Sequence, residues 1–200
     1  MGILVTILVL IAIVVLVGLF LIKVYNRLVE LRERVRNAFS QIDVQLERRH
    51  DLIPNLVEVA KKFMAHERET LEGVVNARAS ATQARIEVNG DPTDLAALSK
   101  MQGAETALGG ALGRLLAVSE QYPDLKSDAT MMQLSEELTT TENKIAFARQ
   151  AYNDSVTGYH TYKQSFPPVL LAGMFGFKDS AYLDLDDEPE KREVVEVDFE

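Results

Sequence analysis

Residues 3–22 read ILVTILVLIAIVVLVGLFLI, twenty residues without a charged side chain. A helix rises about 1.5 Å per residue, so this segment would span about 30 Å, the thickness of the hydrocarbon core of a bilayer. A cleaved signal peptide is a poorer interpretation, because no basic residue precedes the apolar run and it contains no small-residue cleavage site. We therefore predict a transmembrane anchor over residues 1–23.

The charged residues next to the anchor predict its orientation. Lys23, Arg27, Arg32, Arg34 and Arg36 follow the apolar run, whereas no Lys or Arg precedes it. By the positive-inside rule, the flank that carries the basic residues faces the cytoplasm. The sequence thus predicts a single-pass protein of the cell (inner) membrane, with its N-terminus outside and its bulk in the cytoplasm. An extracytoplasmic bundle is the alternative.

Composition limits what the rest of the chain can be. Residues 24–183 suffice for one domain with a substantial core. The absence of cysteine excludes disulfides, zinc-thiolate sites and thiol catalysis. Most of the net charge of −9 lies in residues 184–200, and no basic patch indicates a nucleic acid partner. We predict that 184–200 is a disordered acidic tail, although 194–199 alternates like a strand that could extend a partner's sheet.

Apolar residues recur at helical spacing after the anchor. Between residues 23 and 88 they follow one another almost always at steps of three, four or seven, at Leu28, Val35, Phe39, Ile42, Leu46, Ile53, Ala60, Phe63, Leu71 and Val74. We interpret 23–88 as one long helix continuous with the anchor. Pro54 cannot donate a helical hydrogen bond, so we expect a kink or local break over residues 50–53.

Two further helices are predicted after the turn 89–94. The first covers 92–122 with Asp91 as its N-cap, and its four glycines would allow a neighbouring helix to approach closely. The second covers 128–165 and carries a coiled-coil heptad seam of Met131, Leu138, Ile145, Tyr152, Tyr159 and Phe166. The apolar segment 169–177 is too short to span a membrane, so it would pack on the helices or dip into the membrane interface.

Several blocks of the sequence resemble the LemA family of bacterial membrane proteins. They are residues 25–29, 36–46, 48–58, 77–78, 142–153, 166–167 and 175–177, of which the block RRHDLIPNLVE at 48–58 is specific. The resemblance covers about 25–182. It implies an all-α fold in which an N-terminal transmembrane helix continues into an antiparallel bundle of three long helices, with a possible short C-terminal element. It also implies no established catalytic activity.

Few residues could carry catalysis or hold a metal. Residues 66–70 begin like the HExxH helix of zinc proteases, but Thr70 stands where the second histidine ligand would be. His50 and Asp51 are adjacent and would face different directions on a helix. No P-loop, dinucleotide fingerprint or nucleophile elbow is present in the sequence. We predict no catalytic residue, no metal site and no cofactor.

The polar residues around Pro54 form the candidate site. They are Arg48, Arg49, His50, Asp51, Pro54 and Asn55. Arg49 falls where the apolar series would next place a core residue, so we expect it to be partly buried and paired with Asp51 or Glu142. Arg or Asn side chains could also satisfy the carbonyl groups that Pro54 frees. The cluster would either lock the structure or recognise a partner.

These observations favour a non-enzymatic, membrane-anchored helical bundle that acts as a scaffold or adaptor. Its expected partners are the lipid bilayer, further copies of itself in a homo-oligomer, and other membrane proteins. An accessory subunit that regulates a membrane enzyme, such as a protease, is the alternative interpretation.

Overall fold

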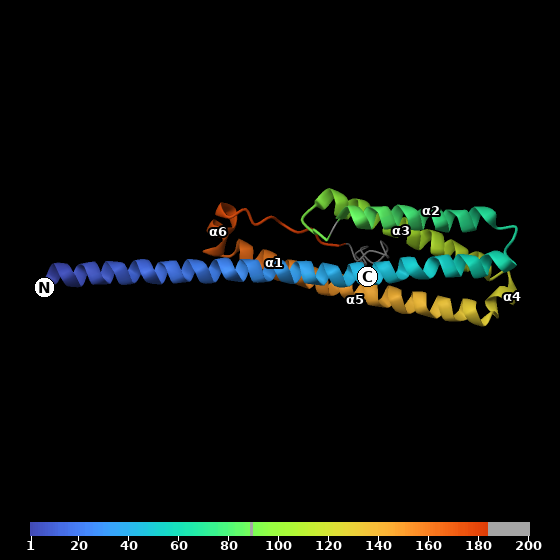
Figure 1. Cartoon of the computed structure of the whole chain (residues 1–200), viewed down its shortest axis with the longest axis horizontal. Helices are drawn as coiled ribbons and strands as arrows, with labels where there is room; N and C mark the ends of the chain where they lie inside the picture. The colour runs from blue at the N-terminus through green and yellow to red at the C-terminus, as the bar shows by residue number, and fades with distance from the viewer. Residues whose placement is uncertain (89, 184–200) are drawn as a thin grey trace, which may run out of the picture.

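The computed structural model describes residues 1–88 and 90–183, and this part of the chain is all-α (Figure 1). The elements are α1 (Gly2–Phe63), α2 (Arg68–Val88), α3 (Leu95–Ser119), α4 (Pro123–Lys126), α5 (Ala129–Gln164) and α6 (Pro168–Met174). The predicted fold class is confirmed. The predicted tail 184–200, with its alternating segment 194–199, lies outside the described residues.

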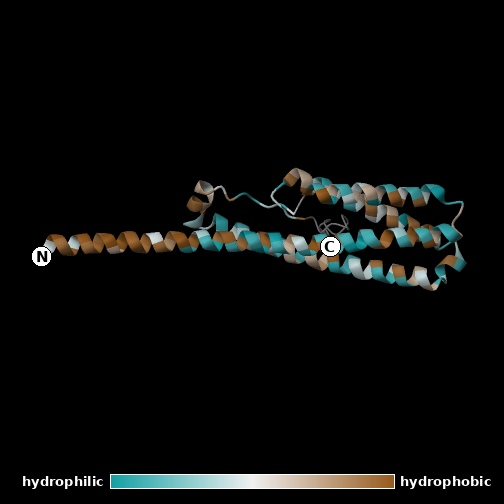
Figure 2. Ribbon diagram, viewed as in Figure 1, coloured by the Kyte–Doolittle hydropathy of each residue, from teal (hydrophilic) through white to brown (hydrophobic). Residues whose placement is uncertain are grey.

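α1 joins the apolar anchor to the bundle without interruption. It contains 62 residues and is therefore about 93 Å long. Its first third is apolar and exposed on all sides, and Figure 2 shows it projecting beyond the other helices as a brown rod. This part is long and apolar enough to cross a membrane. The predicted continuity between the anchor and the first bundle helix is confirmed.

The first bundle helix nevertheless ends earlier than predicted. α1 stops at Phe63, a turn follows in which the Glu67 N–H donates to the Met64 carbonyl at 3.1 Å, and α2 runs back along α1 (Figure 1). The described bundle therefore has four long helices where three were predicted. The turn contains no Gly, Pro, Asn or Asp, and the buried residues Met64 and Leu71 keep the spacing of seven across it. For these reasons the apolar spacing did not predict the turn.

The long helices pack as two antiparallel pairs. α1 packs along α5 and α2 along α3, and contacts between α1 and α2 join the pairs (Figure 1). The buried apolar residues form two clusters, one nearer the anchor around Phe39 and Tyr152 and one at the far end around Leu56 and Leu108. Polar side chains at the level of Arg49 separate the two clusters.

The later long helices begin close to the predicted positions. Asp94, and not Asp91, caps α3 by accepting the Ala97 N–H at 3.0 Å, while Asp91 accepts the Thr93 N–H inside the preceding turn. Asp128 caps α5 by accepting the Met131 N–H at 2.9 Å. Each helix thus begins with a carboxylate that satisfies a free backbone donor.

The glycines of α3 do not mediate a close helix approach. Gly103, Gly109, Gly110 and Gly113 are exposed, and a Cβ atom added to any of them would have no neighbour within 4 Å. α3 packs through another face, with Leu98, Met101, Leu108, Leu112 and Leu115. The expectation of close packing at the glycines was therefore wrong for the described bundle, because the two faces of α3 are distinct.

Gly110→Ala is expected to stabilise the bundle. Alanine is favoured over glycine in a helix interior by about 1 kcal/mol, and the added methyl group meets no neighbour. Denaturation of the full chain in detergent should show a higher midpoint. Gly176→Ala is the control expected to lower it, because Gly176 has a φ of 68°. A lower midpoint for Gly110→Ala would contradict the exposure of this face.

The segment after α6 runs back toward the middle of the bundle (Figure 1), where side chains of α5 bind its backbone. The Tyr159 and Tyr152 hydroxyls donate to the carbonyls of Lys178 and Ala181, each at 2.8 Å. Asn153 donates to the Leu183 carbonyl at 2.8 Å and accepts the Leu183 N–H at 3.0 Å. These bonds explain why the second half of α5 is rich in aromatic and polar residues.

The seam of α5 ends before its last predicted member. Met131, Leu138, Ile145, Tyr152 and Tyr159 are all buried, as predicted. Phe166 lies beyond the end of α5 and its side chain is 81% exposed, so its assignment to the seam was wrong. The residues Pro167 and Pro168 redirect the chain at this point, which takes Phe166 out of the helical register.

Candidate functional site

A buried ion pair joins α1 to α3 between the two apolar clusters. The Arg49 guanidinium donates through Nη2 to Glu105 Oε2 and through Nη1 to Glu142 Oε2, the latter at 2.6 Å. The side chains of Arg49 and Glu105 are 3% and 2% exposed, whereas that of Glu142 is 46% exposed. Arg49 therefore links an interior carboxylate to one at the surface of α5.

His50 lies beside this pair and extends the contact to α2. Its Nε2 is 2.9 Å from Glu105 Oε1, and its Nδ1 is 3.2 Å from the Thr82 hydroxyl. Neither of the atoms Nε2 and Oε1 has another hydrogen-bond partner among the described residues. We refer to Arg49, His50 and Glu105 together as the polar layer.

The neighbours of Glu105 control its charge. Burial disfavours the charged form and by itself would raise the pKa of the Glu105 carboxyl. His50 and the Arg49 guanidinium outweigh burial and hold that pKa below its ordinary value. For Arg49, burial acts to lower the pKa, but Glu105 and Glu142 reverse this and raise it. Both members of the pair are therefore charged at neutral pH.

The lowered pKa of Glu105 predicts a loss of stability in acid. An acid whose pKa is lower in the folded than in the unfolded chain contributes stability above the unfolded value and loses it as the pH falls through the folded value. With an unfolded value of 4.5, the contribution of Glu105 should begin to shrink near that pH. It is measured as the difference in unfolding free energy between the wild type and Glu105→Gln at a series of pH values.

Asp51→Asn is the matched control for this pH series, since it removes an exposed carboxylate from the same level of the bundle. It should leave the pH dependence of the unfolding free energy close to that of the wild type. A difference between wild type and Glu105→Gln that stays constant into acid would contradict the assignment of Glu105 as the acid-sensitive group.

Pro54 connects the polar layer to α2 through the backbone. It has no N–H to donate to the carbonyl of His50, four residues earlier. Arg78 of α2 donates its Nε to this carbonyl at 2.6 Å. The expectation that an arginine satisfies a carbonyl freed by Pro54 is confirmed. The predicted local break was wrong, since α1 is helical throughout this region and the free carbonyl is satisfied from outside the helix.

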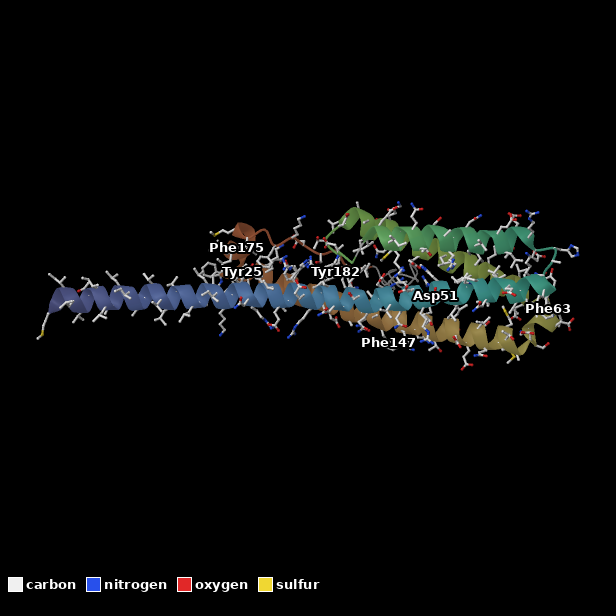
Figure 3. All side chains as sticks on the ribbon, in the orientation of Figure 1. Tyr25, Asp51, Phe63, Phe147, Phe175 and Tyr182 are labelled. Carbon is white, nitrogen blue, oxygen red and sulfur yellow. The ribbon has the colours of Figure 1, made fainter. Side chains whose placement is uncertain are left out.

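The structure divides the predicted cluster between two faces of α1. Arg49 and His50 are buried, while Arg48, Asp51, Pro54 and Asn55 are exposed. Of the two predicted partners of Arg49, Glu142 is the one that binds it, and the Asp51 side chain lies on the exposed face (Asp51 is labelled in Figure 3).

Sequence analysis did not predict Glu105, which is the carboxylate of the polar layer. A signal was present in α3, where Leu98, Met101, Leu108, Leu112 and Leu115 alternate at steps of three and four and skip position 105. A glutamate at a core position needs a buried cation as partner. Arg49 stands at the equivalent gap in the apolar series of α1, so the two gaps could have been paired.

The contacts of the polar layer run between the helices of the bundle. Its charged groups face one another, and Arg78 is engaged by a carbonyl group. A hollow between α1 and α2 lies farther from the anchor and is lined by Lys61, Met64, Arg68 and Glu72, among others, but not by the layer. Within residues 1–88 and 90–183, no group of three or more His, Asp or Glu side chains could hold a metal ion.

Comparison with known proteins identifies the family. Residues 38–199 match the LemA family. The chain belongs to the LemA family. It is also similar to the magnetosome proteins MamQ 1 and MamQ 2 of Paramagnetospirillum magneticum and MamQ of Magnetospirillum gryphiswaldense, each 28% identical over 176 residues. The matches cover 79% of this chain and 64% of each relative, so the chain spans less than two thirds of the length of these relatives.

The polar layer lies inside the LemA-matched region. The block 48–58, which carried the resemblance in sequence, contains Arg49, His50 and Pro54. In the structure Arg49 binds Glu105 of α3, and His50 contacts Thr82 of α2 and accepts from Arg78 of α2 through its carbonyl. Together, the LemA match and the long apolar start of α1 show a membrane-anchored helical protein.

Proposed function

We propose that this LemA-family protein is a non-enzymatic scaffold or adaptor, which holds copies of itself or other membrane proteins at the cytoplasmic face of the membrane. The observation that carries the proposal is the unbroken course of α1 from the apolar anchor to Phe63. The part of α1 beyond the anchor is about 60 Å long. The bundle is therefore a rigid post on the membrane and not a domain on a flexible linker.

The contacts that the buried polar groups make support a structural role. Arg49 and His50 each contact Glu105, and Arg78 binds a backbone carbonyl. Side chains of these types could perform acid–base chemistry in a cleft, but in this bundle they join one helix to another. The similar MamQ proteins are named for the magnetosome and not for a reaction, which also favours a non-catalytic role.

Copies of the chain are the first partners to test. Anchoring confines them to two dimensions and raises their effective concentration, so weak contacts between bundles suffice for assembly. The outward surface of α5 exposes two large apolar side chains, Met132 and Phe147, at 60% and 73%. Contacts between such surfaces would align the posts side by side.

Cysteine crosslinking in membranes tests this function. Because the chain has no cysteine, one cysteine introduced at Asn76, Gly110 or Phe147 probes the exposed face of α2, α3 or α5 alone. Oxidation should link copies through at least one of these faces, whereas Ile53→Cys, which is buried, should give no crosslink. Solubilised protein should run as a discrete oligomer.

The other outcomes of this experiment overturn the proposal. A small species that co-purifies with one membrane enzyme, such as a protease, would indicate an accessory subunit of that enzyme instead. A monomer that is not linked to any protein through the three faces would exclude a scaffold. The same cysteines test orientation, because a cytoplasmic bundle is labelled by a membrane-impermeant thiol reagent only after the membrane is permeabilised.

A further inference from the structure

The base of the bundle carries a group of exposed apolar side chains on and beside α6. Leu171 and Ala172 of α6 are buried against α1 and α5. The opposite side of this segment exposes Phe166, Leu170, Met174 and Phe175, which we call the foot. The exposed fractions of Phe166 and Met174 reach 81% and 79%. Large apolar groups gathered in this way on a surface indicate that something covers them.

The foot lies at the level where the anchor ends. An apolar groove joins the two, lined by Leu21, Ile22 and Tyr25 of α1 and by Leu171, Met174 and Phe175. The rings of Tyr25 and Phe175 are 5.1 Å apart between centroids, and Figure 3 shows them together at the base of the bundle. In Figure 2 the brown of α6 stands beside the point where α1 changes from brown to teal.

The position of Tyr25 identifies this level as the membrane interface. The uncharged run of α1 ends at Ile22, and Tyr25 follows by about one turn of helix, or about 5 Å. Tyrosine is enriched at the boundary between headgroups and acyl chains, where its ring is apolar and its hydroxyl is hydrated. The exposed Lys23 stands at the same level, where a lysine can extend its ammonium group to the lipid headgroups.

We propose that the foot is a second membrane contact, in which Phe166, Leu170, Met174 and Phe175 insert into the acyl–headgroup boundary of the bilayer beside the anchor. The occupant of this surface is therefore lipid. Continuity with the anchor carries the assignment, since the groove that joins the foot to α1 is apolar on both sides and opens at interface depth. Apolar faces of interfacial elements enter the boundary by about 5–10 Å.

The second contact would fix the tilt and rotation of the bundle. A single transmembrane helix leaves the post free to tilt and turn about its axis. α6 is packed on both α1 and α5, so lipid contact at the foot restrains two long helices at once. This holds on either side of the membrane and does not depend on what the outer faces of the bundle bind.

Tryptophan fluorescence in vesicles tests the proposal. The chain has no tryptophan, so Phe175→Trp introduces a single probe into the foot, and Phe147→Trp places a matched probe on α5 at an exposed site about 30 Å farther from the membrane. The full chain is reconstituted into phosphatidylcholine vesicles containing lipids brominated near the top of the acyl chains. Emission from Phe175→Trp should be blue-shifted and quenched at least about twofold, and acrylamide in the buffer should quench it weakly.

Brominated lipid and acrylamide together distinguish a tryptophan in lipid from one in water and from one covered by protein. Phe147→Trp should be quenched by acrylamide and not by brominated lipid. Adding Leu170→Asp and Met174→Asp to Phe175→Trp should remove most of the lipid quenching, with helical content measured to show that the bundle is folded. The proposal is overturned if Phe175→Trp behaves like Phe147→Trp. It is equally overturned if Phe175→Trp is protected from both quenchers, because a second copy of the chain would then cover the foot.

Discussion

Arg49→Met is expected to lower the free energy of unfolding of the bundle by about 3–5 kcal/mol. The substitution keeps a long apolar stem in the core but leaves Glu105 charged and buried, with His50 alone beside it. A buried charge without its partner cannot recover the hydration that it lost on folding. The measurement is chemical denaturation of the full chain in detergent, followed by circular dichroism.

Arg48→Met is the matched control, because Arg48 is the preceding residue on α1 and its side chain is exposed. Its effect should stay within about 0.5 kcal/mol of zero. The double variant Arg49→Met with Glu105→Leu should recover most of the lost stability, since two apolar side chains replace both charges. Equal costs for Arg48→Met and Arg49→Met, or no recovery in the double variant, would show that the ion pair does not hold the layer.

Much of the core could be read from the sequence because its spacing is regular. The apolar series of α1 named seven of the residues that the structure buries, although it missed Val24, Leu31, Leu56 and Val59 and included Phe63, which is half-buried. The position of Arg49 in that series identified it as an interior arginine. The same argument applied to α3 would have named Glu105, which occupies a core position in the apolar series of that helix. An apolar heptad series therefore predicts buried polar residues as well as buried apolar ones, if a polar residue that interrupts the series is also assigned to the core.

The turn 64–67 and the segment 175–183 could not be predicted from the apolar spacing. The turn keeps the apolar spacing and lacks residues that favour turns, so only the packing of α2 on α1 distinguishes it from a continuous helix. The segment 175–183 is held by hydroxyl and amide groups of α5 that bind backbone atoms. Hydrogen bonds to the backbone place no constraint on the bound residue type, so they leave no pattern in that segment.

Arg78→Met is expected to lower the free energy of unfolding by about 2 kcal/mol, because it leaves the His50 carbonyl unpaired inside the bundle. Its Nε is the donor that replaces the N–H missing at Pro54. In a Pro54→Ala background, the new N–H at position 54 can donate to the same carbonyl within α1. The cost of Arg78→Met should then fall by about 1 kcal/mol. The four unfolding free energies of this double-mutant cycle give the coupling.

Arg114→Met on the exposed face of α3 provides the control for loss of an arginine, and its cost in unfolding free energy should be small and equal in both backgrounds.

Coupling between positions 54 and 78 has a clear physical meaning. Residue 54 lies on the exposed face of α1 and Arg78 reaches a backbone oxygen, so their shared element is the His50 carbonyl. If Arg78→Met costs the same with proline or alanine at position 54, that carbonyl does not link α2 to α1. The guanidinium would then stabilise the bundle through its packing alone.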